Sequence, residues 1–171
     1  QTLPLIPGIE VVGRTPDGTR ILALVSSGGY AQKATAHKGA LIPIPDAVSD
    51  EDALCMLVQG STAWHVLKSL GHLKPGESVV IHAAAGGVGV IAIQLAKLWG
   101  AKVIAIASSP EKRDLALSLG ADIAIDANET DLKAAIIAAN GGKRVDIVLE
   151  MVGGETFDKS LERSEEHTSE L

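Results

Sequence analysis

Short apolar runs alternate with amphipathic stretches along the second half of the chain. The run Val79, Val80, Ile81 is β-branched, and apolar residues recur at helical spacing from Ile91 to Leu98. This alternation predicts strands at 79–82, 102–107, 123–126 and 145–150, and helices at 88–99, 110–119, 130–140 and from about 154. Strands that alternate with helices imply right-handed crossovers, so the predicted fold class is α/β with a doubly wound parallel sheet. The alternation ends before the second half of such a sheet is complete.

Residues 1–47 show a different pattern, in which short β-like runs are separated by Pro and Gly turns. The runs are 10–13, 20–25, 30–36 and 40–44. They predict part of an antiparallel β domain with too few strands to bury a core alone, so we expect further strands before Gln1. Ser49 and the acids after it predict a helix start, with helical stretches at 50–58 and 61–70 separated by Gly60.

The last nine residues, 163–171, are polar and acidic and have no apolar face. They resemble the in-frame translation of a sequencing-library adapter, and we interpret them as a non-native tail. The predicted domains are therefore 1–47, 48–162 and the tail. Without native residues after Glu162, the sheet would keep an unpaired edge after Glu150, and the chain alone risks not folding.

Composition narrows the class of protein. The chain is 46% hydrophobic and 21% charged with a formal charge of -6, which argues against a nucleic-acid partner. One cysteine, Cys55, excludes an internal disulfide and is compatible with a reducing cytoplasm. The stretch 79–96 has no charged residue, but its central glycines and the polar His82 and Gln94 argue against a membrane span.

The residues after the first predicted strand favour a phosphate ligand. The spacing Ala84-x-Gly86-x-x-Gly89 is a dinucleotide fingerprint with alanine at the first glycine position. A strand that enters a helix through Gly86, Gly87 and Gly89 leaves the first helical N–H groups aimed outward. A tight turn without a ligand is the competing interpretation.

The end of the second predicted strand indicates which dinucleotide binds. NAD sites carry an acid there, whereas this chain has Ser108 and Ser109 with Lys112 just beyond. Hydroxyls and a cation suit a 2′-phosphate, so the predicted cofactor is NADPH. The competing interpretation is a solvated helix face that pairs with Glu111 or Asp114, which we favour for Arg113.

Further motifs follow one another in a fixed order from Leu5 to Leu161. They are Pro7-Gly8-Ile9-Glu10-Val11-Val12-Gly13, Gly28-Gly29-Tyr30-Ala31, Gln59-Gly60-Ser61-Thr62-Ala63, His82-Ala-Ala-Ala-Gly-Gly-Val-Gly89, Ser-Leu-Gly-Ala-Asp122 and Glu150-Met-Val-Gly-Gly154. As a set they resemble the zinc-independent quinone oxidoreductase branch of the medium-chain dehydrogenase/reductases. The resemblance implies a partial Rossmann-like domain preceded by part of a GroES-like β domain, the chain being a fragment.

The resemblance also implies roles for single residues. Gly86, Gly87, Val88 and Gly89 would hold the cofactor pyrophosphate, while Ser108, Ser109 and Lys112 would hold the 2′-phosphate. Thr62 would lie near the nicotinamide and Met151 under its far side. Where relatives have a tyrosine near the adenosine, this chain has Ala127.

Zinc separates the two large branches of the family. The position of a ligating histidine in zinc alcohol dehydrogenases is Ile9 here, and a later cysteine ligand aligns near Val58. The loop that carries the structural zinc is absent between Gly13 and Gly28. No zinc site can form in the usual way, and direct hydride transfer to a quinone or an α,β-unsaturated carbonyl becomes the expected chemistry.

No acid or base stands out as catalytic, because the histidines lack a carboxylate partner fixed in sequence. The sequence therefore predicts an NADPH-dependent quinone oxidoreductase without zinc. An enoyl or enone reductase of the same branch and a catalytically idle NADPH-binding protein are the alternatives. By resemblance we expect a cytoplasmic homodimer that acts on a small molecule.

Overall fold

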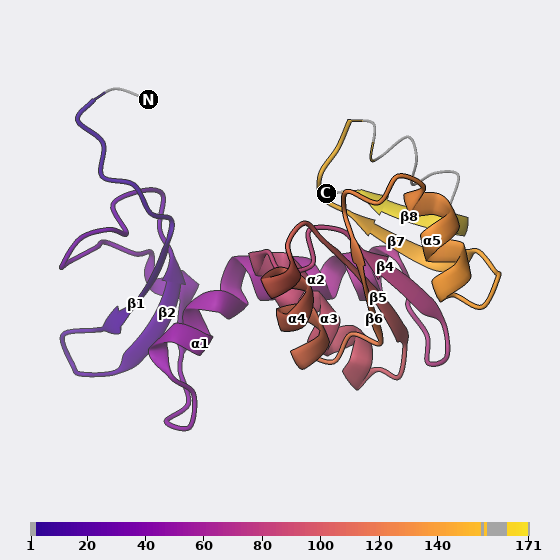
Figure 1. Cartoon of the computed structure of the whole chain (residues 1–171). Coiled ribbons are helices and arrows are strands. Elements are labelled where there is room, and N and C mark those ends of the chain that lie inside the picture. The colour runs from indigo at the N-terminus through magenta and orange to yellow at the C-terminus, as the bar shows by residue number, and fades with distance from the viewer. Residues whose placement is uncertain (1–2, 155, 157–163, 171) are drawn as a thin grey trace. The chain divides into compact units, whose positions relative to one another are not determined.

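The structure is a computed structural model that describes residues 3–154, 156 and 164–170 of the 171-residue chain. Contacts divide the chain into two compact units, Gln1–Ser61 and Thr62–Leu171, each of which is described below by itself (Figure 1). The helix expected from about 154 falls largely outside the described residues.

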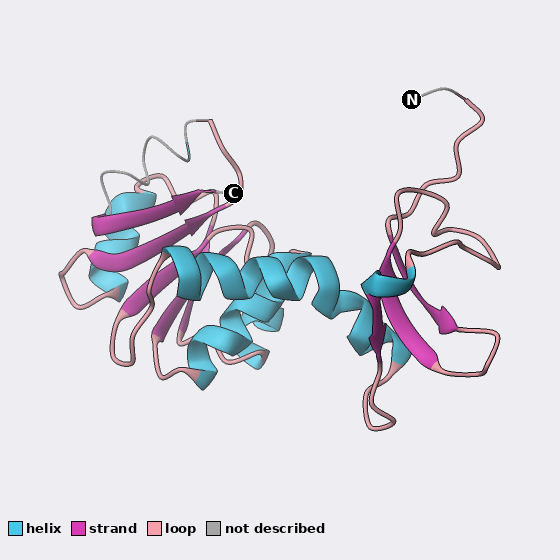
Figure 2. Ribbon diagram, turned by 180° about the vertical axis from the view of Figure 1, so that it is seen from behind, coloured by secondary structure: helices cyan, strands magenta, loops and turns pink. Residues whose placement is uncertain are grey.

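The first unit holds a three-stranded antiparallel sheet in the order β1-β2-β3 (Figure 2). Its elements are β1 (Glu10–Arg14), β2 (Arg20–Leu24), a 3-10 turn η1 (Lys38–Ala40) and β3 (Leu41–Pro43). The strand expected at 30–36 does not form, and that prediction is wrong. The segment lies exposed, and Tyr30 N–H donates to Pro7 O at 2.9 Å instead of to a strand. Its aliphatic side chains are alanines, which gain little from burial.

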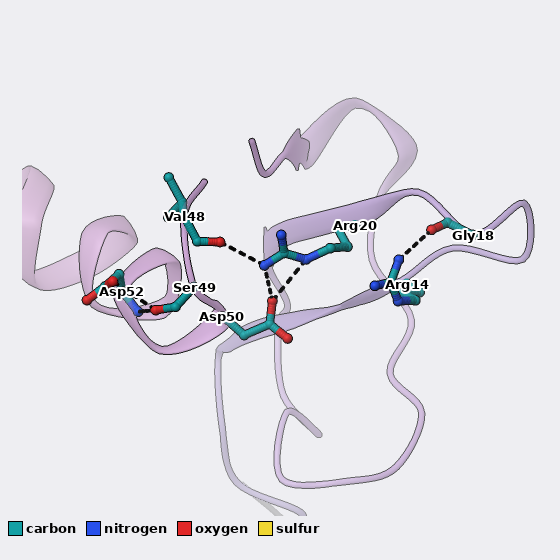
Figure 3. A network of polar contacts seen from close by, with 7 residues as sticks. All are labelled: Arg14, Gly18, Arg20, Val48, Ser49, Asp50 and Asp52. Carbon is teal, nitrogen blue, oxygen red and sulfur yellow. Dashed lines mark hydrogen bonds and ion pairs between the residues drawn. The ribbon is translucent and has the colours of Figure 1, made fainter. Parts of the chain in front are cut away.

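The start of α1 (Asp50–Cys55) is fixed to β2 by polar contacts (Figure 3). Ser49 Oγ caps the helix by accepting from Asp52 N–H at 3.0 Å. The guanidinium of Arg20 pairs with Asp50 and donates to Val48 O at 2.9 Å. A small core of Leu22, Ile44 and Ala53 lies beneath these contacts. The helix start at Ser49 is therefore as predicted, and α1 belongs to the same unit as the antiparallel sheet.

Helical structure continues past the glycine that was expected to interrupt it. The segments are α1, the π-helical η2 (Met56–Gly60), α2 (Ser61–Trp64) and the π-helical η3 (His65–Leu70). Gly60 is buried, and a Cβ there would lie 3.2 Å from the Met56 sulfur. The glycine thus serves a close contact and does not end the helix. Contacts divide the chain after Ser61, and the predicted domain limits stay predictions.

The second unit is built on a five-stranded sheet in the order β6-β5-β4-β7-β8, with every neighbouring pair parallel. The strands are β4 (Ser78–Ile81), β5 (Lys102–Ala107), β6 (Ile123–Asp126), β7 (Val145–Glu150) and β8 (Ser164–Glu170). The helices are α3 (Gly87–Leu98), α4 (Pro110–Ser118) and α5 (Leu132–Ala139). These elements confirm the predicted α/β alternation and the doubly wound parallel sheet.

The expected free edge at β7 does not exist. Residues of β8 pair with β7 in parallel, from Val145 opposite Ser164 to Glu150 opposite Glu170. Strands pair through backbone hydrogen bonds, which form whatever the side chains are. The side-chain pattern of 164–170, which has no apolar face, therefore gave no sign of a strand.

Alternate residues of each strand pack on opposite faces of the sheet. Val79, Ile81, Val103 and Leu149 join the core with α3 and Ala116 of α4. Val80, Ile104, Ile106 and Val148 pack against Ile136 of α5. Because both faces of the sheet are covered, the strands are continuous apolar runs. The covered faces offer no binding surface, so a ligand site is expected at the turns that follow the carboxyl ends of the strands.

Candidate functional site

The turn between β4 and α3 is held by backbone hydrogen bonds. Ala84 N–H donates to Ile106 O of β5 at 3.0 Å, and Gly86 N–H donates to Ala83 O at 2.8 Å. Ala83 adopts a left-handed conformation with φ 45°, which is uncommon for a residue other than glycine. Ala84 is completely buried. The turn is therefore a fixed feature of the fold.

Two glycines of this turn lie close to its backbone, and Gly89 leaves no room for a side chain. A Cβ at Gly89 would lie 2.6 Å from Ala84 O, and one at Gly86 would lie 3.1 Å from Ala83 O. Gly86 is the residue before α3, and no side chain caps the helix there. The first N–H groups of a helix lack partners within it, so this end of α3 can accept an anion such as a phosphate.

A cavity of about 440 Å³ opens beside the turn at the carboxyl ends of β4 and β5. It is lined by His82, Ala83, Ala85, Gly86, Ile106, Ala107, Ser108, Lys112, Ala127, Leu132, Val152 and Thr156. Among the predicted cofactor residues, it brings Gly86, Ser108 and Lys112 together. None of these lining residues is a carboxylate. Lys112 is exposed and makes no ion pair with any described residue.

The remaining predicted cofactor residues do not line this cavity. They are Thr62, Ala84, Gly87, Val88, Gly89, Ser109 and Met151. Met151 packs against the core, and Thr62 is half-buried. Ser109 Oγ accepts from Lys112 N–H at 3.4 Å as the cap of α4, and its hydrogen bond to Glu111 lowers the pKa of that carboxyl. Ser109 is therefore already engaged within its own turn.

Arg113 pairs with an acid outside its own helix, so the interpretation that it pairs with Glu111 or Asp114 is wrong. Its Nη1 lies 2.8 Å from Asp126 Oδ2 at the end of β6 and donates to Ala107 O at 3.3 Å. Asp126 Oδ1 also accepts from Asn128 N–H at 2.9 Å. The hydrogen bond from Asn128 N–H is the chief reason that the pKa of Asp126 is lowered. Burial opposes it, and the charge of Arg113 lowers the pKa further.

Sequence reasoning missed several residues of the cavity wall. Leu132 and Val152 carry no chemical signature, and only the fold brings them to Ala107 beside Ala127, the position where relatives have a tyrosine. His82 is 2% exposed and lines the cavity. Glu150 is fully buried, and its carboxylate accepts from Val152 N–H at 2.7 Å and Gly153 N–H at 2.8 Å. An acid at the end of an apolar strand, just before glycines, could have indicated this support of the wall.

In the first unit, the positions compared with zinc ligands are apolar. Ile9 is 54% exposed, and Val58 is half-buried with its N–H donating to Glu10 Oε1 at 2.9 Å. Within the described ranges, no group of three His, Cys, Asp or Glu side chains could hold a metal ion. None of the helices in the described part of the chain is long and apolar enough to cross a membrane.

Comparisons with known proteins agree with this architecture. Residues 87–166 match the family model described as zinc-binding dehydrogenase. The quinone oxidoreductase of Salmonella typhimurium is 38% identical over 148 residues, which cover 85% of this chain and 45% of that protein. The structure of Escherichia coli quinone oxidoreductase complexed with NADPH is 32% identical with a TM-score of 0.89, covering 96% of this chain and 54% of that one.

The chain is thus similar to the quinone oxidoreductase branch of the medium-chain dehydrogenase/reductase superfamily. Its second unit is the Rossmann-like part and its antiparallel sheet the GroES-like part. The structure of CurK enoyl reductase is also similar, at 30% identity and a TM-score of 0.83 over 94% of this chain and 51% of that one. The chain spans about half the length of the quinone oxidoreductase relatives it matches.

Proposed function

We propose that this chain carries cofactor-binding parts of an NADPH-dependent oxidoreductase that reduces a quinone-type acceptor without zinc. The observation that carries the proposal is the cavity at the carboxyl ends of β4 and β5, which joins Gly86, Ser108 and Lys112 without a lining carboxylate. The close approaches at Gly86 and Gly89 fit the glycine cradle that a pyrophosphate needs.

Each part of the cavity has a task in this proposal. The N–H groups at the start of α3 bind the pyrophosphate, and Ser108 and Lys112 bind the 2′-phosphate. Ile106, Ala107, Ala127 and Leu132 provide an apolar surface for the adenosine. Thr62 and Met151, which do not line this cavity, would contact the nicotinamide end of the cofactor. NADPH supplies the hydride when bound, and the chain orients it and excludes water.

The proposal includes no zinc because the residues at the two compared ligand positions are apolar. Neither Ile9 nor Val58 can ligate a metal ion, and polarising an alcohol for oxidation is hard without one. Hydride transfer to an electron-poor acceptor needs no such metal. A quinone is favoured by the similarity to quinone oxidoreductases. An enoyl or enone reductase is the second candidate, and the similarity to CurK enoyl reductase favours it.

A fluorescence titration with NADPH and with NADH tests the cofactor. Trp64 and Trp99 report on it, and Trp99 contacts the Lys68 ammonium at 4.5 Å from its ring centroid. We expect saturable NADPH binding at least about tenfold tighter than NADH binding, a difference of about 1.4 kcal/mol. Binding of neither cofactor by a chain that circular dichroism shows to be folded would overturn the proposal.

Steady-state assays separate the two acceptor classes and the idle alternative. NADPH oxidation that depends on a benzoquinone supports quinone reduction, whereas oxidation that depends only on an enone supports the second candidate. Cofactor binding without turnover of either acceptor supports a catalytically idle protein.

A cytoplasmic location and a homodimer remain part of the proposal. Sedimentation of the chain with and without NADPH tests whether it forms a homodimer.

A further inference from the structure

We infer that Asp126 is a specificity-determining residue, which weakens the preference for NADPH by holding Arg113 away from the 2′-phosphate. The inference rests on the proposed function, since it concerns the same cavity. It adds residues that lie behind the cavity wall and do not themselves line it. Two neighbouring cations of α4 differ in their surroundings, since Lys112 lines the cavity and Arg113 does not.

Lys112 and Arg113 occupy adjacent positions but different surroundings. Lys112 is exposed and lines the cavity, whereas the Arg113 side chain is only 21% exposed and lies against the ends of β5 and β6. Arg113 Nη1 is 2.8 Å from Asp126 Oδ2 and 3.3 Å from Ala107 O. Ala107 and Ala127, the neighbour of Asp126, both line the cavity. Arg113 is thus a second cation, which contacts the cavity-lining residue Ala107 without lining the cavity itself.

Asp126 is itself held in place by its own turn. Its Oδ1 accepts from Asn128 N–H at 2.9 Å and from Asn128 Nδ2 at 3.0 Å, which leaves Oδ2 directed to Arg113. Asn128 Nδ2 lies in addition 3.5 Å from Ser108 O. The carboxylate therefore offsets the charge of Arg113 and holds its guanidinium away from the cavity. This opposes binding of a 2′-phosphate and leaves binding of the 2′-hydroxyl of NADH little affected.

The substitution Asp126→Asn tests this role in the full chain. An asparagine keeps an acceptor for the Asn128 N–H group but removes the charge that holds Arg113. We expect NADPH to bind about tenfold more tightly, as one further charge-assisted hydrogen bond provides, while NADH affinity changes by less than about twofold. The double variant Asp126→Asn with Arg113→Gln should lose this gain, because the released cation is no longer present.

Asn128→Ala is the matched control, since it removes a side-chain partner of Asp126 and leaves the Arg113 pair in place. Its NADPH to NADH ratio should stay within about twofold of the parent chain. An unchanged ratio in Asp126→Asn, or a gain that persists without Arg113, would overturn the inference and leave the proposed function intact. Failure of the parent chain to bind either cofactor would overturn both. Circular dichroism of each variant tests whether it is folded.

Discussion

At the scale of single residues, Gly89 has the least space of the glycines in the turn. An added Cβ would lie 2.6 Å from Ala84 O and 2.7 Å from Ala83 O, and both are backbone atoms that cannot move alone. We therefore expect Gly89→Ala to lower the free energy of unfolding by about 2 kcal/mol, as overpacking does. Urea denaturation measures the difference.

Gly13→Ala is the control for this substitution. A Cβ at Gly13 meets no heavy atom within 4 Å, and Gly13 has no positive φ. We expect this variant to stay within about 0.5 kcal/mol of the parent chain. Equal losses in the two variants would mean that the close approach at Gly89 has no special cost.

Lys112 is the cation that we propose binds the 2′-phosphate, so the cofactor preference should depend on it. We expect Lys112→Gln to weaken NADPH binding about tenfold and NADH binding by less than about twofold, because only NADPH carries the 2′-phosphate. Lys143→Gln, at an exposed loop position, removes the same charge elsewhere. Cofactor titrations of both variants should therefore separate a local contact from a general effect of net charge. Equal weakening of NADPH and NADH would contradict the assignment.

At the scale of elements, Asp122 ties a helix to a strand. It accepts from Lys97 of α3 at 2.7 Å and from Val103 N–H of β5 at 2.7 Å. Burial works to raise the pKa of Asp122, but the hydrogen bonds from Lys97 and Val103 outweigh it and lower the pKa. A carboxyl with a lowered pKa stabilises the fold above its ordinary pKa of about 3.9 and loses that contribution as the pH falls through the folded-state value.

We therefore expect Asp122→Asn to cost about 1 kcal/mol at pH 7, a figure reduced by solvent screening because the side chain is 37% exposed. The cost should begin to shrink once the pH falls below about 3.9, because the unfolded parent chain then takes up a proton at Asp122, and it should be lost as the pH falls through the lower pKa of the folded state. Urea unfolding at pH 7 and at pH 3 measures it. Asp114→Asn, on the exposed side of α4, should cost little at either pH. An Asp122→Asn cost that does not depend on pH would show that the charge is unimportant.

At the scale of the whole molecule, the two units differ in how much apolar surface they bury. The buried apolar residues described in the first unit are Ile21, Leu22, Ala23, Val25, Ile44 and Ala53, whereas the sheet of the second unit is covered on both faces. Local opening requires less free energy where fewer apolar contacts must be broken. We expect amides of β2 to exchange at least about tenfold faster than those of β5 in hydrogen-exchange mass spectrometry.

The ladders supply an internal control for this measurement, since β2 and β5 are both central strands with a neighbour on each side. Equal protection of the two strands would show that the units open together. Addition of NADPH should slow exchange at the start of α3 more than in β2, because the proposed cofactor binds N–H groups there.

The sequence by itself determined the α/β alternation and the glycine turn. Period and residue size are local properties, and they locate β4, β5, β6 and β7 to within a residue of the observed strands. The close approaches at Gly86 and Gly89 likewise follow from a spacing that can be read in one stretch of chain. Where the pattern was weak, at 30–36 and 164–170, the sequence predictions for strand and edge were wrong.

Only the tertiary structure decided which side chains meet. Asp126 reaches Arg113 because β5 and β6 are adjacent, and Ala127 and Val152 reach the cavity because parallel strands end at one edge. Such partners are distant along the chain, and no regular sequence separation between them reveals that they meet. The sequence thus specified the turn that can hold a phosphate. The packing of the sheet decided that Lys112 lines the cavity and that Arg113 is paired behind it.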